Sequence, residues 1–252
     1  MFLAHYFKEI KALKPYFITI VTVVFLSYII YAFCSEDMIV NLGTEDGFFE
    51  WLTAIFSLAA SIIFILVFRR TKNIFLLGLG FIFFMGAGEE ISWGQRVFNF
   101  DTPESIKKVN VQREFNLHNL ELFNDSSLEH KKKKGFERLL EINMLYRIFS
   151  VTFCILIPLF FLYIKPQWAG NMNKKIRMPV VPVTIGVFFF ISWAIFYSLK
   201  YAILPRGRII WYYLSSGEIF EFTASFVYFL IALYFFKRKD DGFLGKYPVL
   251  DK

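Results

Sequence analysis

Six long apolar segments constrain the fold of this chain more than any other feature of its sequence. Each is long enough to cross a hydrocarbon core of roughly 30 Å as a helix that rises about 1.5 Å per residue. They lack the alternation of polar and apolar residues that is typical of barrel strands, and backbone amides in hydrocarbon must be hydrogen-bonded within their own segment. We therefore expect an all-α, polytopic membrane helical bundle of about six transmembrane helices. The segments are residues 16–34, 48–68, 74–98, 142–164, 179–204 and 216–236.

The composition indicates one transmembrane domain over residues 1–252. Hydrophobic residues make up 56% of the chain, and its mean hydropathy of +0.49 lies outside the range of soluble globular domains. We expect no cleavable signal peptide, because the first apolar segment is long and Cys34-Ser35-Glu36 does not fit a cleavage site. The first segment is therefore expected to remain as an anchor.

Lysine and arginine residues gather on one set of segment flanks. By the positive-inside rule these flanks are cytoplasmic, which places both termini in the cytoplasm. The net charge of +7 then reflects basic flanks that meet anionic head groups, so membrane lipids are expected partners. No nucleic-acid partner is expected, since no soluble segment carries a basic face interleaved with stacking aromatics. The basic flanks are Lys8, Lys11, Lys14, Arg69, Arg70, Lys72, Lys165, Lys174, Lys175, Arg177, Lys237, Arg238 and Lys239.

The same topology makes residues 99–141 an extracytoplasmic loop with short helices between the third and fourth membrane helices. Thr102 followed by Pro103 indicates one helix start, and Ser126 with Glu129 fits a capping box for another. Apolar residues alternate between these two sites, so we expect the loop to fold back onto the bundle as a lid. The lysines at 131–134 are unusual outside, but long loops are translocated with little regard to charge.

Two adjacent carboxylates, Glu89 and Glu90, follow an apolar run that is too short to cross a membrane alone. The run, residues 74–88, provides about 15 residues or roughly 22 Å of helix. Ionisable groups at this depth cost free energy, and by default they indicate function. A carboxylate at a helix C-terminus also opposes the helix dipole. Either the helix continues through Arg96 or the acids have a partner.

Polar stripes on the second and sixth helices begin at the same outer side as this glutamate pair. Residues at helical spacing share one face, and a polar face is expected inside a bundle and not against lipid. The stripes are Asp46, Glu50, Thr53, Ser57 and Ser61 on the second helix, and Glu218, Glu221, Ser225 and Tyr228 on the sixth. Three helices thus bring carboxylates to a similar depth.

N-capping is the alternative interpretation for the acids nearest the helix starts. Thr44 precedes Glu45 and Asp46, and Ser215 lies three residues before Glu218, as expected of caps and first-turn acids. Glu50 and Glu221 lie a turn deeper in their helices, where capping no longer explains them. For these we expect a buried functional role.

The converging side chains predict a carboxylate-rich site at the outer leaflet. Its expected cofactor is a divalent metal ion, because carboxylate and imidazole groups together suit such ions. The candidate metal ligands are Glu50, Glu89, Glu90, His118, Glu218 and Glu221, and the candidate catalytic residues are Glu89, Glu90 and His118. The candidate substrate-binding residues are Arg96, Gln95, Arg206 and Arg208, since guanidinium groups bind phosphate in a bidentate manner. Alternatively, the arginines only neutralise the glutamates, and His118 is a hydrogen-bonded surface residue.

The glutamate pair also belongs to a longer sequence motif. The string GEEISWGQR at 88–96 is followed by TPE and by NVQREFNLHN at 110–119, and it is preceded by EDGFFEWLTA at 45–54. This combination resembles an uncharacterised family of multi-pass bacterial inner-membrane proteins over roughly residues 44–122. The resemblance implies a location in the bacterial cytoplasmic (inner) membrane and no particular activity.

Three functions follow from these observations, and the sequence leaves all three open. The first is a metal-dependent enzyme that acts on a lipid-linked or phosphate-bearing substrate. The second is a cation- or proton-coupled transporter or channel, which requires a polar path to the cytoplasmic side. The third is a non-catalytic membrane assembly or sensing subunit, in which buried charges specify helix pairing.

Overall fold

The computed structural model describes residues 2–43, 47–129, 131–163, 176–203 and 209–237. Within these ranges the protein is helical, and extended pairing is confined to two isolated bridges. Three helices, within residues 37–71, 142–161 and 217–237, are long and apolar enough to cross a membrane. The predicted all-α fold class is confirmed.

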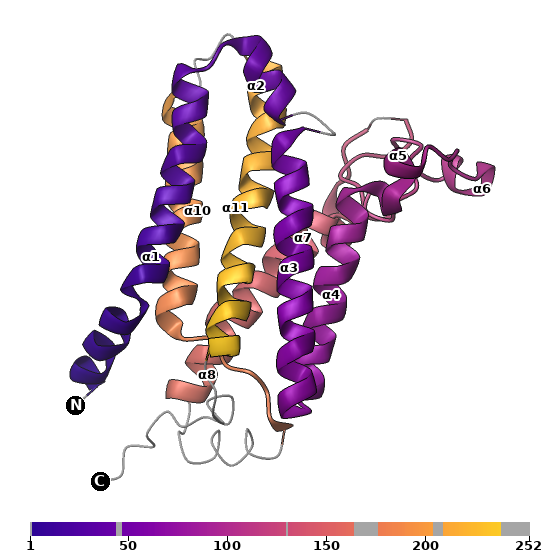
Figure 1. Cartoon of the computed structure of the whole chain (residues 1–252). Helices are drawn as coiled ribbons and strands as arrows, with labels where there is room; N and C mark the ends of the chain where they lie inside the picture. Colours follow the sequence, from indigo (N-terminus) through magenta and orange to yellow (C-terminus); the bar gives the residue numbers. More distant parts are fainter. Residues whose placement is uncertain (1, 44–46, 130, 164–175, 204–208, 238–252) are drawn as a thin grey trace.

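Helices occur at all six predicted segments; most run side by side along one direction, and the fourth crosses them obliquely (Figure 1). A short helix, α2, links the first of them to the second. The π-helical turn at Thr152–Leu156 joins α7 to α8, so that these form one run. The bounds are α1 Phe2–Phe33, α2 Glu36–Gly43, α3 Phe48–Thr71, α4 Ile74–Glu90, α7 Ile142–Val151, α8 Ile157–Tyr163, α10 Val183–Ile203 and α11 Ile209–Lys237.

Several predicted boundaries are wrong. Helix α1 begins at Phe2, well before the expected residue 16. The third helix, α4, stops at Glu90, so it does not continue through Arg96. Helix α11 starts at Ile209, which places Ser215 and Glu218 inside the helix, and the capping interpretation of these residues fails. Residues 179–182 precede α10 without being helical. Thr44, Glu45 and Asp46 lie outside the described residues.

Helix α3 is central to one side of the bundle, because it packs extensively against both α4 and α11. The hydroxyl of Ser57 donates to the hydroxyl of Ser225 on α11 at 3.2 Å, and Ser61 donates to the carbonyl of Gly80 on α4 at 2.7 Å. Thr53, Ser57 and Ser61 are 2%, 4% and 1% exposed. The predicted polar stripe therefore faces the bundle interior, where it joins helices.

Aromatic side chains fill the middle of the bundle. Tyr228 of α11 is fully buried, with its ring centroid 4.8 Å from that of Phe83 and 5.8 Å from that of Phe149. Its hydroxyl is 2.7 Å from that of Ser150, which ties α7 to α11. These contacts form a dense layer across the bundle.

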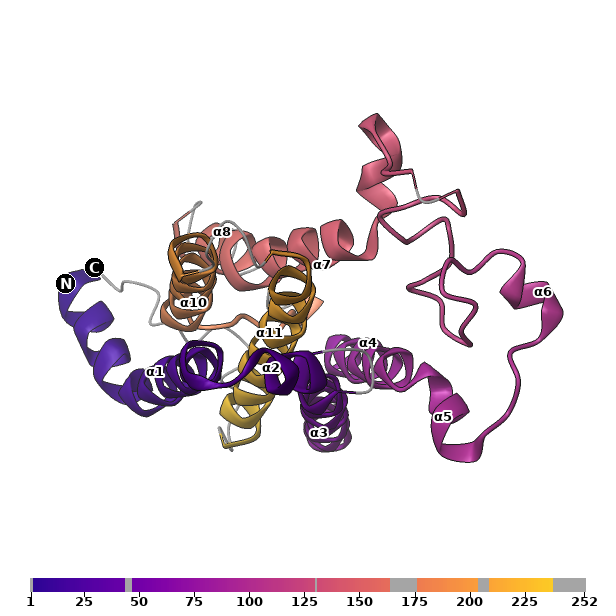
Figure 2. The same cartoon turned by 90° about the horizontal axis from the view of Figure 1, so that it is seen from above.

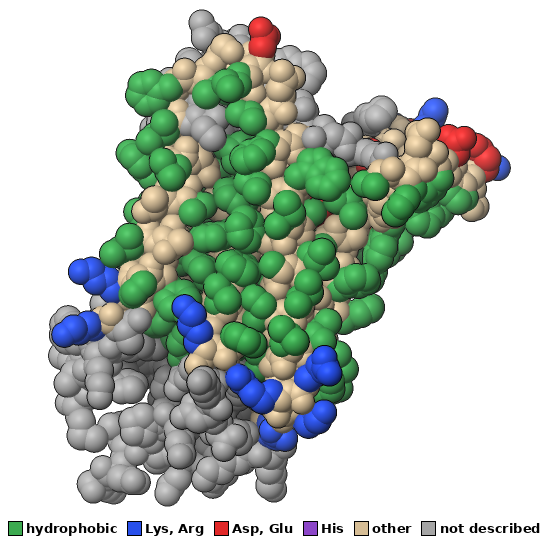
Figure 3. Space-filling view, in the orientation of Figure 1, with side chains coloured by type: hydrophobic (Ala, Val, Ile, Leu, Met, Phe, Trp, Pro, Cys, Tyr) green, Lys and Arg blue, Asp and Glu red, His purple; other side chains and the backbone are tan. Residues whose placement is uncertain are grey.

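The two ends of the bundle differ in charge. Figure 3 shows Lys and Arg side chains at the end where α3 stops, including Arg69, Arg70 and Lys237 in the last turns of α3 and α11. We call this the basic end. The opposite end, where α4 stops at Glu90, is called the pocket end. Apolar side chains cover the sides between the two ends, and Phe25 and Phe81 are 62% and 61% exposed.

A structured loop leaves the bundle at the pocket end and projects to one side, as Figure 2 shows. It contains the short helices α5 (Gln95–Phe98) and α6 (Glu104–Lys107) and a 3₁₀ turn at Gly135–Leu140. Pro103 directly precedes α6, as the sequence predicts. The capping box expected at Ser126 is wrong, because that residue forms an antiparallel bridge with Lys132.

Candidate functional site

The site begins where α4 ends, at a sharp change of backbone direction. Ser92, Trp93 and Gly94 all have positive φ angles, of 44°, 53° and 79°, so the helix cannot continue past them. Gly88 is part of the same turn: a Cβ atom there would lie 2.9 Å from the ring of Trp93. The ring therefore folds back over α4 only because residue 88 has no side chain.

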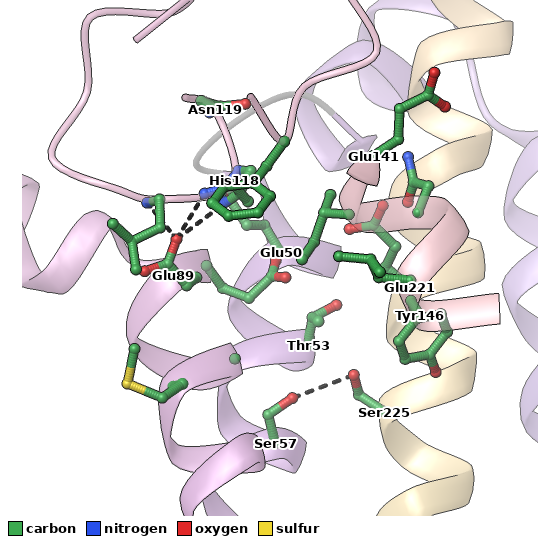
Figure 4. A pocket seen from close by; sticks show the side chains of 18 of the residues that line it. Glu50, Thr53, Ser57, Glu89, His118, Asn119, Glu141, Tyr146, Glu221 and Ser225 are labelled. Carbon is green, nitrogen blue, oxygen red and sulfur yellow. Dashed lines mark hydrogen bonds and ion pairs between the residues drawn. The ribbon is translucent and has the colours of Figure 1, made fainter. Parts of the chain in front are cut away.

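Glu89 attaches the loop to the end of α4. One oxygen, Oε1, accepts a hydrogen bond from Trp93 Nε1 at 2.6 Å. The other, Oε2, accepts from the backbone N–H groups of Leu117 at 2.5 Å and His118 at 2.9 Å, and His118 Nδ1 lies 3.4 Å away (Figure 4). Both oxygens are thus occupied by protein donors, which suits a carboxylate. The acid at the helix end has the partner that the sequence left open.

Three asparagines form the interior of the loop. Asn110, Asn116 and Asn119 are only 1%, 3% and 4% exposed. Asn110 Nδ2 donates to the side-chain and backbone oxygens of Asn116, both at 3.0 Å, and the backbone of Asn119 accepts from Val111 N–H at 2.8 Å. Short polar side chains that bond nearby backbone stabilise such turns. The asparagines of the NVQREFNLHN string therefore serve the loop's own folding.

Gln95 also stabilises the fold of the loop. Its Nε2 donates to Thr102 Oγ1 at 2.8 Å, and its Oε1 accepts from Phe115 N–H at 2.8 Å. Both ends of the amide are engaged inside the loop, so the structure does not direct Gln95 toward a substrate. Of the other predicted substrate-binding residues, Arg206 and Arg208 lie outside the described residues. Arg96 lies in α5, and its side chain is not among those described.

A pocket of about 690 Å³ lies beneath the loop at the pocket end. Its walls come from α3, α4, α7 and α11, and residues 117–119 and 123–125 of the loop cover it, as expected of a lid. Most of the wall is apolar or aromatic. Its polar side chains include Glu50, Glu90, His118, Glu218 and Glu221, which are five of the six predicted metal ligands. The sixth, Glu89, lines the pocket while its two oxygens bind the loop.

Glu90, Glu218 and Glu221 form a compact carboxylate cluster. One oxygen from each lies within 4.8 Å of the others, with Glu90 supplied by α4 and the other two by α11. Glu50 of α3 and Glu89 lie within electrostatic range of Glu90, and His118 lies within range of Glu221. Figure 4 shows Glu50, His118 and Glu221 around the same space. A divalent cation fits this donor set, because hard oxygen ligands at such spacing can share one ion.

Several residues of the pocket were missed from the sequence, among them Glu141 and Tyr146. Glu141, which immediately precedes α7, is 8% exposed and lines the pocket. Tyr146 of α7 also lines it, and its shielded hydroxyl has no hydrogen-bond partner among the described residues. An aromatic residue within an apolar helix gives no charge pattern to notice. Only the packing of α7 against α11 brings it to the site.

No family model, curated protein or solved structure matches this chain. The function therefore has to be inferred from the geometry of the pocket itself.

Proposed function

We propose that this chain is a multi-pass protein of the bacterial cytoplasmic (inner) membrane, with six crossings and both termini in the cytoplasm. The charge difference between the two ends supports this orientation, because basic residues flanking membrane helices favour the cytoplasmic side. The basic end is then cytoplasmic, and the pocket lies at the outer leaflet beneath the loop of residues 99–141.

Within that frame, we propose a metal-dependent enzyme that acts on a lipid-linked or phosphate-bearing substrate. The carboxylate cluster of Glu90, Glu218 and Glu221, within 4.8 Å, carries this proposal. Like charges at this spacing repel one another, and a bound divalent cation relieves that repulsion. A bound ion would also polarise a carbonyl or phosphoryl oxygen of the substrate.

Each pocket residue then has a distinct role. Glu90, Glu218 and Glu221 hold the ion, and Glu50 adds a further carboxylate to the same pocket. His118 is the group that moves a proton, because an imidazole ring has one nitrogen that can donate a proton and one that can accept it. Glu89 is a positioning residue: it fixes the backbone of His118 through the hydrogen bond at 2.9 Å.

The transporter alternative is less well supported. It needs a polar path from the pocket to the basic end, yet the hydroxyls of Ser57 and Ser61 are engaged with Ser225 and Gly80 on neighbouring helices. Further along α3, Phe64 and Val67 are fully buried in the core. Among the described residues, the polar face of α3 therefore ends in apolar packing.

The metal proposal is tested by measuring Mn²⁺ binding to the purified full-length protein in detergent. We expect Glu221→Gln to weaken Mn²⁺ binding at least about tenfold, or roughly 1.4 kcal/mol, because the variant loses one anionic ligand of the cluster. Glu104→Gln is the matched control, because Glu104 is exposed on α6, where its carboxylate pairs with Lys107 at 3.0 Å, and it does not line the pocket. Equal binding by Glu221→Gln and the native protein, or no binding by the native protein, would refute the metal site.

A further inference from the structure

The pocket has one apolar side, which is formed by α4 and α7. Phe81 and Ile82 of α4 line it and are 61% and 49% exposed. Ile142 and Leu145 of α7 line it from the opposite side and are 43% and 36% exposed. These four side chains thus contact the pocket and the outer surface of the bundle at once. They border an opening in the side of the protein.

The other sides of the pocket are closed by protein. The loop covers it at the pocket end, where Glu89 holds the backbone of Leu117 and His118. Helices α3 and α11 close the back, joined by the hydrogen bond between Ser57 and Ser225. Toward the basic end, the aromatic layer around Tyr228 closes the bundle. In Figure 2, seen from above, α4 and α7 lie apart from each other, and the loop projects sideways from their ends.

The side chains at the opening are apolar, as lipid acyl chains are, whereas the interior carries carboxylates that can bind a polar head group through a metal ion. Water-soluble ligands do not partition through an apolar side opening that faces lipid chains, whereas a lipid already lies there. The carboxylate cluster lies toward the loop, at the level where lipid head groups meet water. A volume of about 690 Å³ holds a head group and the first part of an acyl chain, but not a whole lipid.

We propose that a phospholipid of the outer leaflet enters this pocket sideways, between α4 and α7. Its phosphate reaches the cluster of Glu90, Glu218 and Glu221, and its acyl chains stay between Phe81 and Leu145 and extend into the bilayer. The phosphate is the group that is recognised, since a divalent ion held by carboxylates has its remaining coordination positions open to phosphate oxygens. This inference names the substrate class of the proposed enzyme and rests on that function.

The test narrows the opening without touching the cluster. The full-length protein in detergent is titrated with a phosphatidylglycerol that carries a fluorescent label on its acyl chain, and binding is followed by polarisation. Leu145→Trp places a larger side chain at the opening, and we expect lipid binding at least tenfold weaker. Leu159→Trp is the matched control, because Leu159 belongs to the same helical run, has the same 36% exposure and does not line the pocket. Equal loss in both variants, or none in Leu145→Trp, would overturn the sideways route.

Mn²⁺ binding by the same variants separates this inference from the proposed function. We expect Leu145→Trp to bind Mn²⁺ within about twofold of the native protein, which also shows that the variant is folded. Chelation of the metal should abolish lipid binding by the native protein. Lipid binding that survives chelation and favours an amine head group over phosphatidylglycerol would overturn phosphate recognition. Lipid binding that is lost in Leu145→Trp in a protein without any Mn²⁺ affinity would refute the metal proposal while supporting the route.

Discussion

Glu89 shows how a single acid at the end of an apolar helix can be used for structure. Its carboxylate accepts from one side chain and two backbone N–H groups, at 2.6, 2.5 and 2.9 Å. Hydrogen bonds to a charged group contribute about 1.5–3 kcal/mol each, roughly twice the value of neutral ones. The side chain therefore stabilises the loop over the pocket.

Replacing Glu89 by Gln is expected to loosen this attachment. A glutamine amide can accept hydrogen bonds at only one of its two terminal atoms, so one set of donors loses its acceptor. We expect the backbone amides of Leu117 and His118 to exchange hydrogen about ten- to a hundredfold faster, which corresponds to roughly 1.5–3 kcal/mol of local stability. Mass-spectrometric hydrogen exchange over residues 109–121 measures this. Unchanged protection there, or the same loss in Glu104→Gln, would contradict the assigned role.

At the level of elements, the contact between α10 and the π-helical turn depends on one glycine. A Cβ atom at Gly186 would overlap the backbone carbonyl oxygen of Cys154. The clash is with backbone, which cannot move aside as a side chain can. The closeness of these two elements therefore depends on residue 186 having no side chain.

Gly186→Ala is accordingly expected to destabilise the protein by about 1–3 kcal/mol or more, the usual cost of overpacking. Gly78→Ala on α4 is the control, because no atom lies within 4 Å of the added Cβ. Alanine in an open helical position stabilises by about 0.5–1 kcal/mol. In thermal denaturation in detergent, we expect the Tm of Gly186→Ala to lie below that of the native protein and the Tm of Gly78→Ala to lie above it. A Gly186→Ala variant as stable as Gly78→Ala would show that the two elements separate without cost.

The sequence predicts helix positions well and helix ends less well, for a physical reason. Apolar length determines where a membrane helix can lie, so all six expected segments contain helices. The end of α4 depends instead on the donors that meet Glu89 and on the space above Gly88, which come from the folded loop. Helix spacing alone could not reveal that Glu218 lies two turns inside α11.

For the candidate site, likewise, the sequence predicts which residues share a helix face but not what each side chain contacts. Spacing along α3 and α11 predicts that Glu50 and Glu221 face the bundle interior, because i, i+3 and i+4 positions share a face, and both residues line the pocket. The roles within the pocket were not visible in the sequence. Glu89 and Gln95 have the residue types of a reactive site, yet their hydrogen bonds are made within the protein. Only the folded positions of their hydrogen-bond partners show that these two side chains support the loop.

At the level of the whole molecule, the charge difference between the two ends predicts its orientation. In a background with Cys34→Ser and Cys154→Ala, single cysteines are introduced at two exposed positions on opposite ends. We expect a membrane-impermeant maleimide to label Lys132→Cys in intact spheroplasts, and to label Arg69→Cys only after lysis. Labelling of Arg69→Cys in intact spheroplasts would reverse the orientation and place the pocket in the inner leaflet.

The dense aromatic layer beneath the pocket blocks the movement of a bound lipid through the bundle to the other leaflet. With Phe83, Phe149 and Tyr228 packed across the bundle, a molecule held against α3 and α11 has no onward route through the described part of the chain. It must return through the same gap by which it came. Turnover in such a blind recess would alter the chemistry of one leaflet while leaving the number of lipids in each leaflet unchanged.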